Sequence, residues 1–225
     1  MIWLILLLLL VAVVAGPGIW VKAVLKRYSV RLDYLPGTGG ELARHLINRF
    51  ELKAGLEETL QGDHFDPSDN IVRLKQEHLQ GQSLTAVVVA AHEVGHAIQF
   101  HQRDWRLLLR SKLALLAAMV QKLAQIAIML MPILSLIPAT AILGRGLFLV
   151  IIVSIVFNLL VHLITLPVEF DASFNKALPI LQKGEYLNQS DLTKARKILR
   201  ACALTYVSSA VMGLLNLSTL FRRIR

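Results

Sequence analysis

The feature that most constrains this chain is a set of long apolar segments that carry almost no charge. Residues 1–21 contain no charged side chain. A second apolar block lies between Lys122 and Glu169 and contains Arg145 as its one charged residue. An α-helix needs about 20 apolar residues to cross the hydrocarbon core of a bilayer. Because both segments reach this length, the sequence predicts a membrane protein.

The composition excludes several other classes of protein. Hydrophobic residues make up 55% of the chain and charged residues 17%, whereas about a quarter of a soluble domain is charged. The single Cys202 excludes an intramolecular disulfide framework. The net charge of +9 indicates loop lysines and arginines that face the cytoplasm, and not a surface for nucleic acid.

The apolar segments predict three to four membrane helices. Residues 1–21 form an anchor with its N-terminus outside, because basic residues follow it from Lys22 onward and none precedes it. The second block divides near Pro138–Gly146 and places two membrane helices within residues 113–166. Residues 201–225 form a last apolar helix, which either spans the membrane or lies at its surface.

Two polar regions lie between these segments, and the positive-inside rule places both on the cytoplasmic side. The first, residues 22–112, predicts a helix over 38–50 that begins with a capping box. It also predicts a strand over 70–75 and a long helix that Ser83 caps. The second polar region covers residues 167–200. The mixture is α+β with a small number of strands.

The long helix contains His92-Glu93-Val94-Gly95-His96, an H-E-x-x-H motif. Residues four apart share one helix face, so the two imidazoles converge on one point. Zinc binds histidine nitrogens, and the glutamate beside the first histidine can take a proton from water at the metal. Chance predicts roughly 0.008 such matches in a chain of this composition. The motif therefore favours metal-assisted hydrolysis of an amide over two unrelated histidines on a surface helix.

A catalytic zinc needs a third protein ligand. Gln99 and Gln102 stand where metzincins have glycine and histidine, and no Leu-Asp-Gly segment of intramembrane zinc proteases is present. Gluzincins remain, and they supply a glutamate from a later helix. Glu169 directly follows a predicted membrane helix and is the preferred ligand. Asp171 is about 200° away around the helix and either orients a ligand histidine or is itself the ligand.

Other side chains have weaker assignments. His64, in the turn-rich segment 61–67, lines the cleft or is a hydrogen-bonded turn residue. Tyr206 stabilises an oxyanion or packs against other helices. His45 and His78 are expected on the solvated surface. The strand near residues 70–74 would pair with an extended substrate.

Several blocks of the chain together resemble the YugP-type membrane zinc metallopeptidases, the neutral zinc metallopeptidases, nearly from end to end. The resemblance implies a gluzincin-like fold, one zinc ion, the ligands His92, His96 and Glu169, and Glu93 as the base. The chain is similar, more remotely, to membrane proteases in which the ligand glutamate begins an E-x-x-x-D motif. This chain has Ser173 at the last position of that motif. The matching blocks are Gly39–Arg44, Asp63–Pro67, Val89–Gln99, Leu166–Ser173 and Ala203–Val207.

We therefore expect a mainly α membrane protein with a gluzincin-like α+β zinc-peptidase domain that acts as an endopeptidase. The alternative is a zinc-binding membrane scaffold or adaptor without peptidase activity. We expect a multi-pass protein of the bacterial cytoplasmic membrane, with its active site facing the cytoplasm and membrane proteins or peptides as substrates. The expected divisions are 1–21 (anchor), 22–112 (peptidase region), 113–166 (two membrane helices), 167–200 (third ligand) and 201–225 (C-terminal helix).

Overall fold

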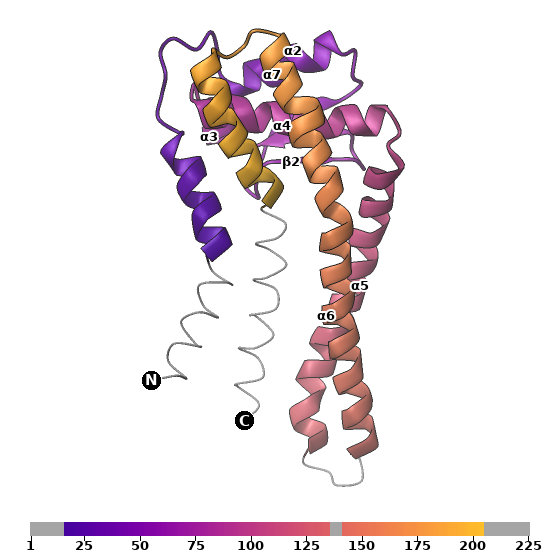
Figure 1. Cartoon of the computed structure of the whole chain (residues 1–225). Helices are drawn as coiled ribbons and strands as arrows, with labels where there is room; N and C mark the ends of the chain where they lie inside the picture. Colours follow the sequence, from indigo (N-terminus) through magenta and orange to yellow (C-terminus); the bar gives the residue numbers. More distant parts are fainter. Residues whose placement is uncertain (1–15, 136–140, 205–225) are drawn as a thin grey trace, which may run out of the picture.

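The structure is a computed structural model that describes residues 16–135 and 141–204. A cap of helices and one small sheet lies at one end, and two long helices, α5 (Trp105–Ser135) and α6 (Ala141–Phe170), extend from it (Figure 1). Two further helices, over 16–27 and 189–204, lie across from this pair (Figure 1). The prediction of a mainly α protein with few strands is confirmed.

The helices of the cap begin where the sequence predicts. Helix α2 (Gly39–Arg49) starts at Thr38, whose side chain accepts a hydrogen bond from the Glu41 N–H, while the Glu41 carboxylate accepts one from the Thr38 N–H. This is the predicted capping box. Helix α4 (Leu84–His101) starts at Ser83, whose hydroxyl accepts from the Ala86 N–H. A short helix, α3 (Gln76–Leu79), precedes it.

The sheet has the strand order β1-β3-β2. Strand β1 (Gly55–Glu58) runs parallel to β3 (Ile71–Leu74), and β2 (His64–Asp66) runs antiparallel to β3 on its other side. The predicted strand is β3, but the expectation that it pairs with substrate is wrong, because both of its edges are occupied. Strand β2 arises within the segment predicted as turns, and among the described strands it pairs on one side alone.

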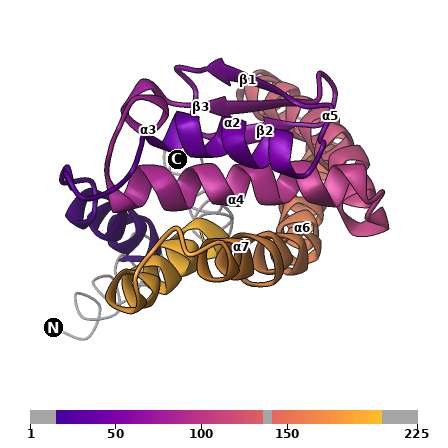
Figure 2. The same cartoon turned by 90° about the horizontal axis from the view of Figure 1, so that it is seen from above.

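Helix α4 forms the centre of the cap. Its side chains are buried at every position from Leu84 to Gln99. Figure 2 shows the reason: α2 and the sheet lie on one side of α4, and α7 (Leu178–Lys183) and helix 189–204 lie on the other. A helix that is apolar on all its faces is buried on every side, and α4 is apolar at most of its positions. The polar residues of its motif therefore lie within the protein interior.

Two described helices, α5 and α6, are long and apolar enough to cross a membrane; the candidate spans are Trp105–Leu134 and Ile142–Lys183. Most of their large apolar side chains are exposed, as expected for contact with lipid. They pack on each other through small residues such as Ala124 and Ala127. Helix α5 starts earlier than the predicted boundary at residue 113. The other predicted spans, 1–21 and 201–225, fall largely outside the described residues.

Helix α6 continues into a π-helical segment, η2 (Asp171–Ala177), and then into α7. Gly95 of α4 packs directly on η2: a Cβ atom at this position would lie 2.9 Å from the Ala172 carbonyl oxygen. A glycine thus permits the close approach of the two helices. Wide π-helical turns are frequent at functional sites, and this one begins two residues after Glu169.

Candidate metal centre

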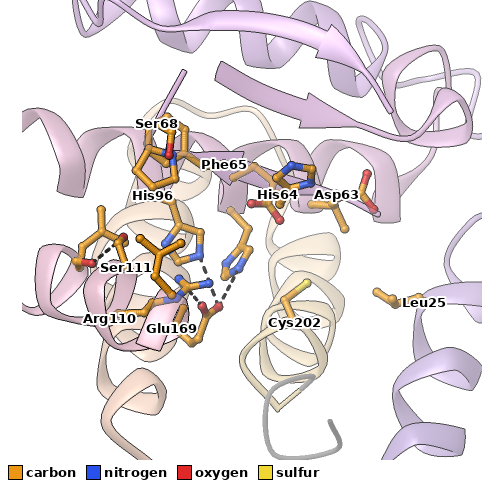
Figure 3. A pocket seen from close by; sticks show the side chains of 17 residues that line it. Leu25, Asp63, His64, Phe65, Ser68, His96, Arg110, Ser111, Glu169 and Cys202 are labelled. Carbon is orange, nitrogen blue, oxygen red and sulfur yellow. Dashed lines mark hydrogen bonds and ion pairs between the residues drawn. The ribbon is translucent and has the colours of Figure 1, made fainter. Parts of the chain in front are cut away.

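Helices α4 and α6 bring three metal-binding side chains together. His92, His96 and Glu169 each offer a ligand atom within 4.8 Å of the others. The Nε2 atoms of both histidines lie 3.3 Å from the same oxygen, Glu169 Oε2 (Figure 3). All three side chains are buried. Glu169 therefore lies where the sequence predicts, beside both histidines.

These separations match the edges of a tetrahedral zinc site. Zinc bonds to histidine nitrogen and carboxylate oxygen at about 2.0–2.1 Å, which places neighbouring ligand atoms about 3.3–3.4 Å apart in a tetrahedron. A direct N–H···O hydrogen bond is most often about 2.9–3.0 Å long. These two distances thus suit a small cation better than direct hydrogen bonds from the histidines to Glu169.

The hydrogen bonds of Gln99 determine which nitrogen of the His96 ring carries the proton. The other nitrogen, which faces Glu169, is then unprotonated. The Gln99 amide nitrogen donates to the Val168 carbonyl oxygen at 3.0 Å and to Asp171 Oδ2 at 2.8 Å. The Gln99 oxygen must therefore accept, and it lies 2.9 Å from His96 Nδ1. With its proton on Nδ1, neutral His96 presents the lone pair of Nε2 to the carboxylate.

The same reasoning applies to His92. The Ser173 hydroxyl donates to the Leu199 carbonyl oxygen at 3.3 Å, so its oxygen accepts from His92 Nδ1 at 3.1 Å. Both histidines then direct a lone pair at a buried carboxylate. This arrangement is costly unless a cation lies between the three groups. The donor set therefore fits a zinc ion with three protein ligands.

Arg110 of α5 completes the surroundings of the carboxylate. Its Nη1 atom lies 2.8 Å from Glu169 Oε1, the oxygen that does not face the histidines (Figure 3). Arg110 therefore holds Glu169 so that Oε2 alone is directed at the two imidazoles. The sequence analysis missed this residue, and no local pattern in α5 indicates it.

Glu93 lies beside the metal group in a cavity of about 420 Å³ that His92 and His96 also line. Burial raises the pKa of its carboxyl to about 7, and the neighbouring His92 partly opposes this shift. A bound cation would also oppose it, because positive charge favours the ionised form. The position suits a group that accepts a proton from water in the cavity.

The remaining predicted residues have different positions. Asp171 lies outside the metal group: its carboxylate accepts from Gln99 and from Asn175, so it contacts His96 only through Gln99. His64 lines the cavity in β2, and its Nδ1 donates to the Gly62 carbonyl oxygen at 2.7 Å. Tyr206 lies outside the described residues. The expectation for His78 is wrong, because it is buried with Nδ1 2.8 Å from Asp63 Oδ2.

Comparison with known proteins agrees with the zinc-binding geometry. Residues 2–225 match the profile of a family described as "Putative neutral zinc metallopeptidase". The chain belongs to this family. It is also 35% identical over 204 residues to "Putative membrane protease YugP" of Bacillus subtilis (strain 168), and the match covers 88% of this chain and 85% of that protein. No solved structure matches.

Gln99 offers a direct test of the hydrogen bonds that support the two histidines in this member of the family. Gln99→Leu removes the acceptor of the His96 Nδ1 proton, and we expect it to weaken zinc binding by about 10–100-fold. Competition with a chromogenic chelator measures the affinity. Gln102→Leu is the matched control, because Gln102 accepts from Lys176 and is exposed. Equal zinc affinity in Gln99→Leu and the wild type would contradict the assigned role.

Proposed function

We propose that this protein is a membrane-embedded zinc-dependent endopeptidase. The observation that carries the proposal is the convergence of His92 and His96 on Glu169 Oε2, at 3.3 Å each. Glu93 lines the same cavity. Two histidines and a glutamate as ligands, with a carboxylate nearby, form the donor set of a hydrolytic zinc site.

Each of the four side chains has a role in this proposal. His92, His96 and Glu169 would hold the ion, which when bound polarises a carbonyl group and makes water a nucleophile at neutral pH. Glu93 accepts a proton from the attacking water on its carboxylate. It then donates that proton to the nitrogen of the leaving amine. The hydrogen bonds from the histidine Nδ1 atoms to Ser173 and Gln99 keep both rings oriented.

The alternative of a zinc-binding scaffold is supported less well. A structural zinc site normally has four protein ligands. Within residues 16–135 and 141–204, the metal group has three members, and it borders a cavity. This arrangement leaves one position for water or substrate, as a hydrolytic site requires.

Strand β2 is the best candidate for binding an extended substrate. It pairs only with β3 among the described strands, and His64 and Phe65 of β2 line the cavity. A peptide could therefore add to its free edge as another strand.

With the active site at the cytoplasmic face, as the positive-inside rule favours, membrane proteins and membrane-near peptides are the natural substrates. Nucleic acid, an oligomer and an adaptor partner play no part in this proposal.

Metal removal tests the proposal on the unmodified protein. Purified protein in detergent should cleave casein or an unstructured peptide, and 1,10-phenanthroline should abolish the cleavage. Addition of zinc to the dialysed protein should restore it, because the donor set suits this ion. Cleavage that persists after the metal has been removed would contradict the proposal.

Arg110 is expected to position Glu169. Arg110→Met leaves Glu169 Oε1 without its ion-pair partner in a buried site, and we expect zinc affinity to fall by about 10–100-fold, as for other groups that orient a ligand. Arg110→Lys should recover part of the loss. Arg106→Met is the matched control, because Arg106 is exposed on the same helix. Calorimetric titration with zinc measures all three, and unchanged affinity in Arg110→Met would contradict the role.

A further inference from the structure

The cavity beside the metal group has two chemically different walls. The cap supplies polar groups, among them Asp63, His64 and Ser68. Helix α5 supplies an apolar wall made of Leu107, Ala114 and Leu115, and helix 16–27 adds Leu25 on the other side of the cavity. In Figure 3, Leu25 lies on the opposite side of the pocket from Arg110 and Ser111. The metal group therefore lies where a polar surface meets an apolar one.

The apolar wall continues into a candidate membrane span. The span in α5 begins at Trp105, which is 67% exposed and has the Arg106 guanidinium 5.9 Å from its ring centroid. An exposed tryptophan beside a cation is typical of the boundary between water and lipid. A helix rises about 1.5 Å per residue, so Arg110 lies about 7.5 Å below Trp105 along α5. Leu115 lies about 7.5 Å deeper still.

This arrangement determines what kind of chain can fill the cavity. A soluble peptide would place polar backbone groups against Leu25 and Leu115 without hydrogen-bond partners, which is costly. A chain that leaves the lipid beside α5 can instead keep its apolar residues against this wall. Its next residues can then extend toward the metal group and the free edge of β2. One end of the cavity thus suits an apolar segment, and the other suits an extended backbone.

We propose that the substrate is a polypeptide with a membrane anchor, and that the cut falls at a short, fixed distance from the end of that anchor. This inference rests on the proposed endopeptidase function. An extended chain advances about 3.3 Å per residue. It therefore covers the 7.5 Å between the levels of Leu115 and Arg110 with two to three residues. The cut should fall about two to three residues beyond the apolar segment.

A series of anchored substrates tests this distance. The full-length protein is reconstituted with zinc in phosphatidylglycerol–phosphatidylcholine vesicles, together with single-span polypeptides that carry one apolar helix and one constant tail. Spacers of 0, 3, 6 and 9 polar residues separate the helix from the tail. Mass spectrometry should locate the cut about two to three residues from the helix in every member. A cut that moves with the tail sequence, or equal cleavage of the tail peptide alone, would overturn the proposal.

A matched pair of variants tests the apolar wall. Leu115 is 72% exposed and lines the cavity, whereas Leu116 is 48% exposed and is not among the described residues that line it. Leu115→Trp should slow cleavage of the anchored substrate at least fivefold without changing zinc content. Leu116→Trp should leave the rate within twofold of the wild type. Equal rates for the two variants would overturn the role of this wall.

A binding measurement separates this proposal from the proposed function. A photoreactive residue at position 115, in a chain that also carries Glu93→Gln, should crosslink to the apolar segment of the anchored substrate. The same group at position 116 should not. Crosslinks from position 115 to lipid alone would overturn the proposal, whatever the activity. A different result is that position 115 crosslinks to the anchor while the enzyme that retains Glu93 fails to cleave this substrate. That result would contradict the endopeptidase function and support the binding site.

Discussion

Replacing Glu93 by glutamine is expected to lower peptide hydrolysis by about 10²–10⁴-fold while zinc binding stays intact. The amide keeps the shape of the side chain but cannot accept the proton of the attacking water. Glu93 is buried beside the metal group and is not one of its three members. The loss should therefore appear in kcat, with little change in zinc affinity. Initial rates on a fluorogenic peptide and metal analysis of the same sample measure both.

Two controls make the Glu93 result specific. Glu77→Gln removes a carboxylate at an exposed position and should leave the activity unchanged. The melting temperature of Glu93→Gln should not fall, because an uncharged amide is easier to bury than a carboxylate. Full activity in Glu93→Gln would exclude this carboxylate as the base. Loss of zinc from Glu93→Gln would instead indicate a role in metal binding.

Replacing Glu169 by glutamine is expected to weaken zinc binding by more than about 100-fold, beyond the effect of removing a supporting group. Glu169 is the one anionic side chain in the metal group, and it is 1% exposed. Without its charge, two neutral histidines and an amide would face a divalent cation in a buried site. Arg110, which lies 2.8 Å from Oε1, would add uncompensated positive charge. Equilibrium dialysis against radioactive zinc measures the loss.

The control for Glu169→Gln is Glu185→Gln, which neutralises an exposed carboxylate later in the same part of the chain. It should retain the wild-type affinity. Asp171→Asn should show a smaller loss than Glu169→Gln, because Asp171 acts through Gln99. An Asp171→Asn loss as large as that of Glu169→Gln would favour the alternative in which Asp171 is a ligand.

The parts of the site that depend on local spacing could be predicted from the sequence. The i, i+4 spacing of His92 and His96 places both imidazoles on one helix face, and Ser83 and Thr38 mark helix starts by their capping chemistry. Local spacing could not predict Glu169, because 73 positions separate it from His96. The small number of later carboxylates in the chain limited the candidates. The comparison of classes of zinc site, the place of Glu169 directly after a predicted membrane helix and the resemblance of Leu166–Ser173 to the family together favoured it.

Features that depend on tertiary contacts were missed. Arg110 reaches Glu169 from a different helix, and nothing in the residues around it indicates that contact. His78 resembles a surface residue in sequence, yet Asp63 pairs with it in the interior. Ser173 supports His92 from the position where distant relatives have aspartate. Strand β3 was identified, but its central place in the sheet depends on long-range pairing with β1 and β2.

We expect one zinc ion to lie between His92, His96 and Glu169. Diffraction data from crystals of the zinc-loaded protein, collected on both sides of the zinc absorption edge, test it most directly. We predict one anomalous peak about 2.0–2.2 Å from the two Nε2 atoms and from Glu169 Oε2. An anomalous peak at other side chains, or none between these three, would contradict the claim.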